Sequence, residues 1–152
     1  MVKTIFSKIL VCVDGSKTAD KALKKAIQIS DQNKSKIAIL HVIDTTLFLN
    51  YYGSGFMVEY APPPLPSGFK SDVKKQIRKE LEKKMTKFQN YNLDYSIKIK
   101  VGNVADEILK SSKGFDLVVI GSRGMGKLKS ALLGSVSSKV VENAKSPVLV
   151  VR

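Results

Sequence analysis

The sequence predicts an α/β domain in which helices cover both faces of a parallel β-sheet. Three observations lead to this fold class. The chain has 152 residues, so residues 1–152 suit one domain that buries roughly 70% of its unfolded surface. Short apolar runs alternate with segments of helical periodicity, in the order β-α-β-loop-α-β-α-β-α-β. Most of these runs are continuously apolar, as in parallel strands that are buried on both faces.

The first part of the chain predicts a strand, a helix and a second strand. The strand is expected at Phe6–Val13, a short apolar run that ends at the turn sequence DGS. The helix is expected at Thr18–Ser30, where apolar residues recur at intervals of three and four and form one stripe. Ser16 and Thr18 are both candidate N-caps for it. The run Lys36–Val42 predicts the second buried strand.

A long connection of about residues 45–70 follows the second strand. It has no apolar periodicity and contains Gly53, Gly55 and the proline-rich run PPPLP. Prolines exclude a helix there and favour extended backbone. Long loops of this kind in compact domains are often lids or binding loops. A stiff variable loop is the prediction, and a proline-rich ligand for a partner domain is the alternative.

The next helix is expected at Ser71–Asn90. Its apolar residues step by four, four, four and three, and lysines and arginine occupy much of the remaining surface. The apolar stripe predicts a core-facing side rather than a partner groove. For the basic face, a solvated surface and a nucleic-acid surface both remain open.

The last part of the chain predicts three strands and two helices. The segment Tyr95–Val101 alternates apolar and polar residues, which is typical of a strand at the edge of a sheet. Asn103 is a candidate cap for a short helix after it. The remaining elements are a buried strand at Phe115–Ile120, a helix at Ser135–Ala144 and a strand at Val148–Val151.

Composition excludes several classes of protein. A single cysteine excludes an intramolecular disulfide framework, and a single histidine argues against a His-rich metal centre. Cys12 is expected to be a buried inert thiol, and His41 a packed or hydrogen-bonded residue. No apolar run reaches the ~18–20 residues of a membrane span, and the N-terminus lacks the apolar region of a signal peptide. A cytoplasmic protein without membrane partners is expected.

The charge of the chain is strongly basic. Twenty-six lysines and arginines stand against 13 acidic residues, which gives a formal net charge of +13. A field of this sign attracts anions such as nucleotides, nucleic acids or acidic surfaces. A lysine-rich surface that only keeps the protein soluble explains the same composition.

The glycine-rich segment from Gly121 to Gly134 carries the strongest chemical signal. It follows a buried strand and leads into a helix. Glycine allows positive φ and close approach of the backbone, so amides of this loop are expected to face phosphate oxygens. The sequence Gly134-Ser135-Val136-Ser137 lies at the start of the helix, where unpaired N–H groups and the helix dipole favour an anion. Positive charge comes from Arg123, Lys127 and Lys129.

Two better-known phosphate motifs do not fit this segment. A P-loop would start at Gly121 and continue through Gly126 and Lys127, but it needs a serine or threonine where Leu128 stands. A dinucleotide fingerprint that starts at Gly124 needs a glycine where Lys129 stands.

The pattern Gly121-x2-Gly124-x9-Gly134-Ser135 resembles the nucleotide-binding motif of the universal stress protein family. The segments ILVCVDGSKTADKAL and LHVID, together with the sequence from Gly121 to the end, are similar to that family as well. The resemblance covers the whole chain except the 45–70 loop.

The resemblance implies a five-stranded parallel sheet of strand order 3-2-1-4-5, a Rossmann-like fold that binds ATP, AMP or ADP, with Mg²⁺ as an optional companion. Asp14 would contact the adenosine end, and the main chain of Val42 would read the adenine edge. Ribose and phosphates would be held by Gly121, Gly124, Gly134 and Ser135, with Arg123, Val136 and Ser137 as additions. A homodimer through Val148–Val151 is also implied, and an exposed apolar edge strand favours the same pairing.

Three hypotheses for function follow. The first is a nucleotide-dependent regulatory switch in the stress response, which an unidentified protein partner reads. The second is a slow ATPase or phosphotransfer enzyme, for which the sequence offers phosphate donors but no visible general base. The third is a basic module for nucleic acid, which is the least favoured, since aromatic residues are not interleaved with the basic ones. The sequence favours the first.

Overall fold

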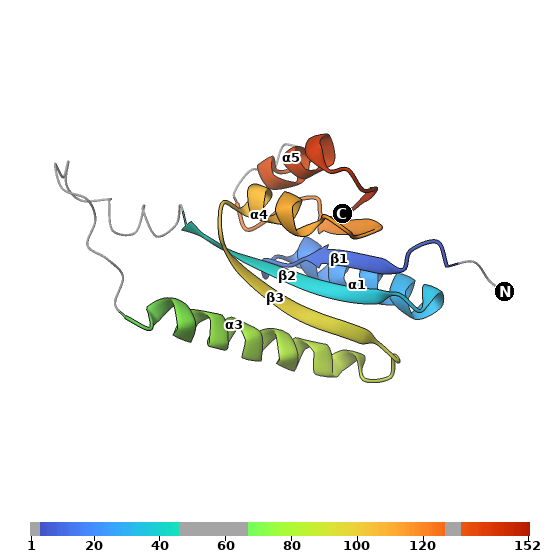
Figure 1. Ribbon diagram of the computed structural model, residues 1–152, viewed down its shortest axis with the longest axis horizontal. Helices are drawn as coiled ribbons and strands as arrows, with labels where there is room; N and C mark the ends of the chain where they lie inside the picture. Colours follow the sequence, from blue (N-terminus) through green and yellow to red (C-terminus); the bar gives the residue numbers. More distant parts are fainter. Residues whose placement is uncertain (1–3, 46–66, 127–131) are drawn as a thin grey trace.

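The computed structural model describes residues 4–45, 67–126 and 132–152 of the chain (Figure 1). The elements confirm the predicted alternation of strands and helices. None of the helices in these ranges is long and apolar enough to cross a membrane. In chain order the elements are β1 (Lys8–Cys12), α1 (Lys17–Asn33), β2 (Lys36–Asp44), α3 (Phe69–Met85), the 3-10 helix η1 (Thr86–Phe88), β3 (Asp94–Gly102), α4 (Val104–Ser111), β4 (Leu117–Gly121), α5 (Ser135–Asn143) and β5 (Val148–Val151).

The five strands form one sheet of order β3-β2-β1-β4-β5. All the pairings are parallel. The strand order implied by the family resemblance is therefore confirmed. β1 lies at the centre and is fully buried from Ile9 to Val11, which explains why its sequence is continuously apolar rather than alternating.

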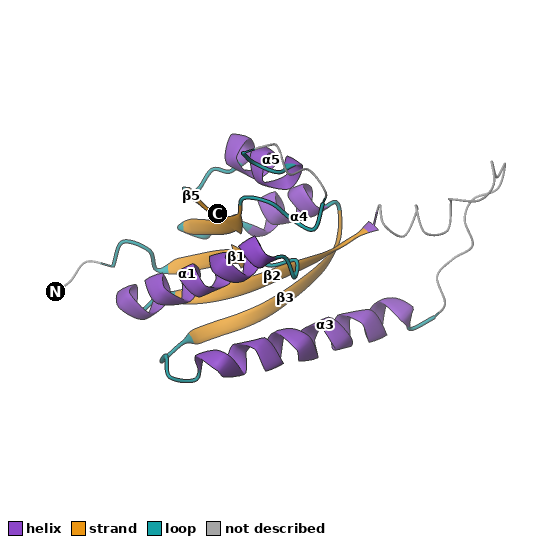
Figure 2. Ribbon diagram, turned by 180° about the vertical axis from the view of Figure 1, so that it is seen from behind, coloured by secondary structure: helices purple, strands orange, loops and turns teal. Residues whose placement is uncertain are grey.

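Two hydrophobic clusters lie on opposite faces of the sheet. On one face, Leu23 and Ile27 of α1 and Leu81 and Met85 of α3 pack against alternate residues of β1, β2 and β4. On the other face, Ile108 of α4 and Val140 of α5 complete the second cluster, and the intervening strand residues point toward them. Figure 1 shows α4 and α5 together above the sheet, and Figure 2 shows α1 across the back of it.

The helix ends follow local capping chemistry. Ser16 is the N-cap of α1, because its Oγ accepts a hydrogen bond from the amide of Ala19 at 3.2 Å. The side chain of Asn103 caps α4 in the same way, as predicted, by accepting from Asp106 N at 3.1 Å. The helix expected at Ser71–Asn90 instead ends at Met85, where the backbone tightens into η1. The loop expected at about 45–70 lies mostly in residues 46–66, outside the described residues.

The strand β3 forms one edge of the sheet, as its alternating sequence predicts. Lys98 and Lys100 are exposed, while Ile97 and Ile99, which alternate with them, are half-buried. Arg78 of α3 donates a hydrogen bond from Nη2 to the Ile97 carbonyl at 3.2 Å. Basic side chains therefore surround this edge of the sheet.

Candidate functional site

The strand order reverses direction at the pair β1 and β4. These two strands are neighbours in the sheet, but the helix after β1 covers one face and the helix after β4 covers the other. The chain therefore continues from β1 and from β4 toward opposite faces of the sheet. Ligands of open α/β sheets bind in the crevice at such a point.

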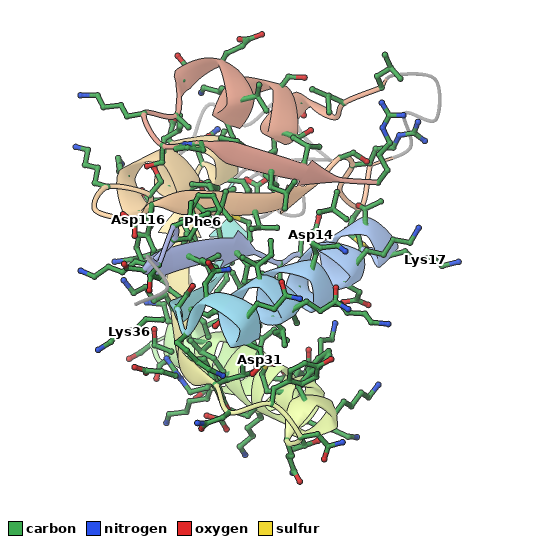
Figure 3. The ribbon with its side chains drawn as sticks, turned by 90° about the vertical axis from the view of Figure 1, so that its right-hand side faces the viewer. Phe6, Asp14, Lys17, Asp31, Lys36 and Asp116 are labelled. Carbon is green, nitrogen blue, oxygen red and sulfur yellow. The ribbon has the colours of Figure 1, made fainter. Side chains whose placement is uncertain are left out.

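Asp14 follows β1 at this edge and is exposed. Its Oδ1 accepts a hydrogen bond from Ser16 N at 2.9 Å, which fixes the carboxylate near the start of α1. Gly15 between them has φ +85°, a conformation that favours glycine. Figure 3 shows Asp14 and Lys17 at one end of the molecule, with Phe6 and Asp116 at the opposite end.

Gly121 ends β4 directly against the first turn of α1. A Cβ at this position would lie 2.7 Å from Thr18 Oγ1, 2.8 Å from Thr18 C and 2.9 Å from Ala19 N. Gly124 lies equally close to Asp14, which follows the end of β1, since a Cβ at Gly124 would lie 2.8 Å from Asp14 Oδ2. Neither glycine has positive φ. The predicted use of positive φ is therefore wrong for both, and close approach is the reason for glycine.

The carbonyl of Arg123 ties the glycine-rich segment to α1. It accepts a short hydrogen bond from Thr18 Oγ1 and a longer one from Ser16 Oγ at 3.4 Å. More than a hundred residues separate these partners in sequence. The side chain of Arg123 is exposed, so its guanidinium stays available near the strand ends.

Ser122 connects three elements of the fold, although no motif in the sequence indicates this role. Its amide donates to the Val151 carbonyl of β5 at 2.7 Å, and its own carbonyl accepts from Gly134 N at 2.7 Å. The same carbonyl accepts from Ser137 Oγ at 2.8 Å. Ser122 is 3% exposed. One buried residue therefore joins the end of β4 to β5 and to the start of α5.

The first turn of α5 leaves amide groups available. Gly134 is its N-cap, and no side chain caps these amides among the described residues. Such N–H groups, with the dipole of the helix, favour an anion. Ser135 is exposed at this end. Ser137 is buried, and its hydroxyl proton is directed at the carbonyls of Ser122 and Gly134. We therefore assign Ser137 to holding the turn rather than to donating to a ligand.

The structure brings most of the predicted site residues to this one edge. Val42 lies one strand further along, on β2, which pairs with β1. It is half-buried and packs on the α4 and α5 side. The other predicted residues lie around β1, β4 and α5, namely Asp14, Gly121, Arg123, Gly124, Gly134, Ser135, Val136 and Ser137. Lys127 and Lys129 fall outside the described residues.

His41 of β2 forms a hydrogen bond with the main chain directly after β1. Its Nδ1 is 3.0 Å from the Val13 carbonyl, so the proton lies on Nδ1 and the ring donates. Burial lowers the pKa of His41 below its ordinary value, against the opposing effects of the Val13 hydrogen bond and the negative charges of Asp14 and Glu80. The expected hydrogen-bonded, non-catalytic role agrees with this geometry.

This pKa shift predicts how stability changes with pH. The folded state favours the neutral ring, so the unfolded chain binds the proton at higher pH. His41 therefore stabilises the fold fully above its unfolded pKa of about 6.5, and this contribution is lost as the pH falls below that value. Because His41 is the sole histidine in the chain, a His41→Gln variant isolates the effect. Its melting temperature is expected to fall less than that of the wild type between about pH 7.5 and 5.5. Equal falls would contradict the prediction.

Cys12 has no part in the chemistry of the site. Burial raises the pKa of its thiol to about 12, which favours the protonated form. The prediction that this thiol is buried is confirmed. Within the described ranges, no three His, Cys, Asp or Glu side chains gather closely enough to hold a metal ion.

Two surface hollows lie away from this edge. One, of about 400 Å³, is lined by the C-terminal half of α1 and by Tyr91. The other, of about 160 Å³, lies between the end of α3 and the start of β3. Because α1 runs back across the sheet, its C-terminal half lies near the amino ends of the strands. Neither hollow touches the residues that gather after β1 and β4.

Comparisons with known proteins agree with this geometry. Residues 6–152 match the model of the universal stress protein family. The universal stress protein YxiE of Bacillus subtilis is 35% identical over 97% of this chain and 100% of its own length. A universal stress protein solved in complex with cAMP superposes with a TM-score of 0.71 at 22% identity, over 97% of this chain and 98% of the other. One from Archaeoglobus fulgidus, solved in complex with dAMP, has a TM-score of 0.64 at 18% identity, over 97% of this chain and 99% of the other.

Proposed function

The chain belongs to the universal stress protein family, and on that premise we propose that it binds an adenine nucleotide and acts as a nucleotide-dependent switch in the stress response. The observation that carries the proposal is the convergence of Asp14, Gly124 and the uncapped start of α5 at the point where the strand order reverses. Cofactors with a phosphate group are favoured at such points. Two structural neighbours, the cAMP and dAMP complexes, bear adenine nucleotides.

The residues suit the parts of an adenine nucleotide. The Asp14 carboxylate is an acceptor for the ribose hydroxyls, and the main chain of Val42 offers partners for the adenine edge. The amides of Ser135 and Val136 at the start of α5 would face phosphate oxygens, with the exposed guanidinium of Arg123 beside them. Gly121, Gly124 and Gly134 would let the backbone approach the ligand. A Mg²⁺ ion that arrives with ATP would rely mainly on phosphates and water.

Ser122 supports the switch part of the proposal. A ligand bound at Gly124 would lie next to Ser122, whose amide donates to β5 and whose carbonyl accepts from the start of α5. A shift of Ser122 would therefore move both the edge strand β5 and the amides at the start of α5 that face the phosphates. A partner protein would read this change at the surface.

The test of the proposed function is direct identification of the ligand. Purified protein is denatured, and the released small molecules are separated by chromatography and identified by mass spectrometry. Adenine nucleotide near one equivalent per chain is expected. If none is released, calorimetric titration with ATP, ADP and AMP gives the second reading, and the absence of heat with all three would reject the proposal.

The proposed homodimer pairs β5 with β5 of a second copy. The carbonyl of Pro147 accepts from Val118 N of β4 at 3.0 Å, and the carbonyl of Val151 accepts from Ser122 N, directly after β4, at 2.7 Å. Main-chain groups alternate along an extended strand, so the amides of Val148 and Val150 face the free edge. Val150→Pro removes one such donor without touching the β4 ladder. A dimer-to-monomer change is expected in sedimentation equilibrium, while Val150→Thr stays dimeric. An intact dimer in the proline variant would exclude pairing through β5.

Thr18 is predicted to hold the glycine-rich segment in its binding geometry. Thr18→Val keeps the shape but removes the hydroxyl that donates to the Arg123 carbonyl. Arg123 is exposed, and a hydrogen bond of this kind contributes about 0.5–1.5 kcal/mol, so a loss of nucleotide affinity of up to about 10-fold is expected by calorimetry. Thr18→Ser retains the hydroxyl and is the matched control, with affinity close to that of the wild type. Equal affinities in both variants would contradict this role.

A further inference from the structure

The outer surface of α3 and η1 concentrates the positive charge of the chain. Residues 69–87 hold eight lysines and arginines and three acidic residues, a net charge of +5 within 19 residues. The nucleotide site proposed above does not use this surface. Its charge therefore needs a separate explanation.

Packing determines which side of α3 is exposed. Ile77, Leu81 and Met85 turn toward α1 and the sheet. On the other side, Lys75, Lys79, Lys83 and Lys87 are all exposed. They recur every four residues, which keeps successive side chains on neighbouring positions of one helix surface, about 6 Å apart along the axis. These four residues form the α3 lysine row.

No ion pair in the described part of the chain involves the α3 lysine row. Lys84, one position away from the row, instead pairs with Asp20 of α1 at 2.5 Å. Glu80, another acidic neighbour, accepts a hydrogen bond from Gln76 at 3.3 Å. Glu82 is exposed beside the row and offsets part of its charge.

The residue types on and around the α3 lysine row indicate which kind of polyanion it can bind. In the described residues the exposed large apolar side chains lie elsewhere, and none belongs to α3. A membrane-surface helix needs an apolar face to insert, and here that face is buried in the core. Unpaired bases need aromatic side chains for stacking, and the row has none. What remains is contact with regularly spaced phosphates, which a nucleic-acid duplex presents.

We propose that the α3 lysine row is a docking surface for the phosphate backbone of double-stranded nucleic acid. The row spans about 18 Å, close to the rise of five nucleotides of one strand. Lysine acts as a point charge rather than as a reader of base edges, so binding is independent of sequence. It is governed by counterion release and weakens steeply with salt. The proposal does not depend on the nucleotide site.

The test compares two variants of equal net charge. Lys75→Gln, Lys79→Gln and Lys83→Gln are combined in one protein. The matched control combines Lys8→Gln, Lys113→Gln and Lys145→Gln, which are exposed lysines outside α3. Each variant loses three positive charges from the formal +13. Binding of the full chain to fluorescent duplex DNA and duplex RNA of random sequence is followed by anisotropy from about 50 to about 200 mM salt.

The row variant is expected to bind at least about 10-fold more weakly than the wild type at the lowest salt. Its slope of log affinity against log salt is expected to fall by about 2 to 3 on duplex DNA, while the control keeps the wild-type slope. The DNA and RNA arms show which duplex is preferred, and row-dependent binding to either supports the proposal. Equal weakening in both variants would show an effect of net charge alone and would overturn it. So would no binding by the wild type, or row-dependent binding to anionic vesicles without binding to duplexes.

Discussion

Gly124→Val is expected to reduce the affinity for adenine nucleotides at least about 100-fold, equivalent to about 2.7 kcal/mol, while the fold survives. A Cβ at Gly124 would lie 2.8 Å from Asp14 Oδ2. Asp14 is exposed and the crowded atom is the end of its side chain, so the carboxylate can rotate away with the loss of its hydrogen bond from Ser16 N, which costs about 1 kcal/mol. That movement removes the proposed ribose acceptor, and the branched side chain takes the space of the ligand. Calorimetric titration with ATP and AMP measures the loss.

Gly126→Val is the matched control for this prediction. It places the same side chain two residues further along the same segment, where a Cβ meets nothing within 4 Å. The control should keep nucleotide affinity within about threefold and melt at the wild-type temperature. If Gly124→Val binds as tightly as Gly126→Val, the strand ends of β1 and β4 do not form the nucleotide site.

Gly121→Ala is expected to act on stability instead. The added methyl group would lie 2.8 and 2.9 Å from main-chain atoms of Thr18 and Ala19. Main-chain atoms in the first turn of a buried helix cannot rotate away as a side chain does, so α1 must shift from β4. Overpacking of this kind costs about 3 kcal/mol, and a fall in melting temperature of about 6–12 °C follows for a chain of this length.

A second substitution shows whether the side chain of Thr18 or the main chain of α1 causes the strain in Gly121→Ala. Thr18→Ala removes Oγ1, the nearest of the three crowded atoms, but leaves both main-chain contacts. The double variant Gly121→Ala with Thr18→Ala should therefore recover only part of the lost stability in a denaturant titration. Full recovery would mean that the threonine hydroxyl alone, and not the close packing of α1 on β4, requires glycine at this position.

The elements of this fold are predictable from the sequence because their signals are local. Continuous apolar runs predict the buried strands, and the alternation in β3 predicts an edge. Helix ends are less predictable, since α1 continues to Asn33 through polar residues that fit a helix as well as a turn. The strand order came from the family resemblance and not from periodicity, because periodicity records which side of an element is buried and not which strand lies beside it.

The candidate site was predictable in its residue types but not in its connections. The glycine pattern indicated phosphate-facing backbone, and the structure gathers those residues. Periodicity cannot show that Thr18 donates to Arg123, because the two lie 105 positions apart. Nor can it show that the Ser137 hydroxyl donates to the Ser122 carbonyl, 15 positions away. Long-range hydrogen bonds depend on how the finished elements pack, and one sequence read locally does not contain that information.

The two edge strands of the sheet differ in how readily they can pair with a strand of another copy of the chain. At β3, the Arg78 side chain donates a hydrogen bond to the Ile97 carbonyl. The exposed Lys98 and Lys100 would repel a second basic strand. At β5, a short apolar strand is open to a copy of itself, and two-fold pairing of identical edges closes on itself after two chains. Pairing of β5 with β3 of another copy would instead propagate without limit into a fibre. The basic side chains along β3 oppose that route, so the proposed homodimer through β5 would close after two chains without extending into a polymer.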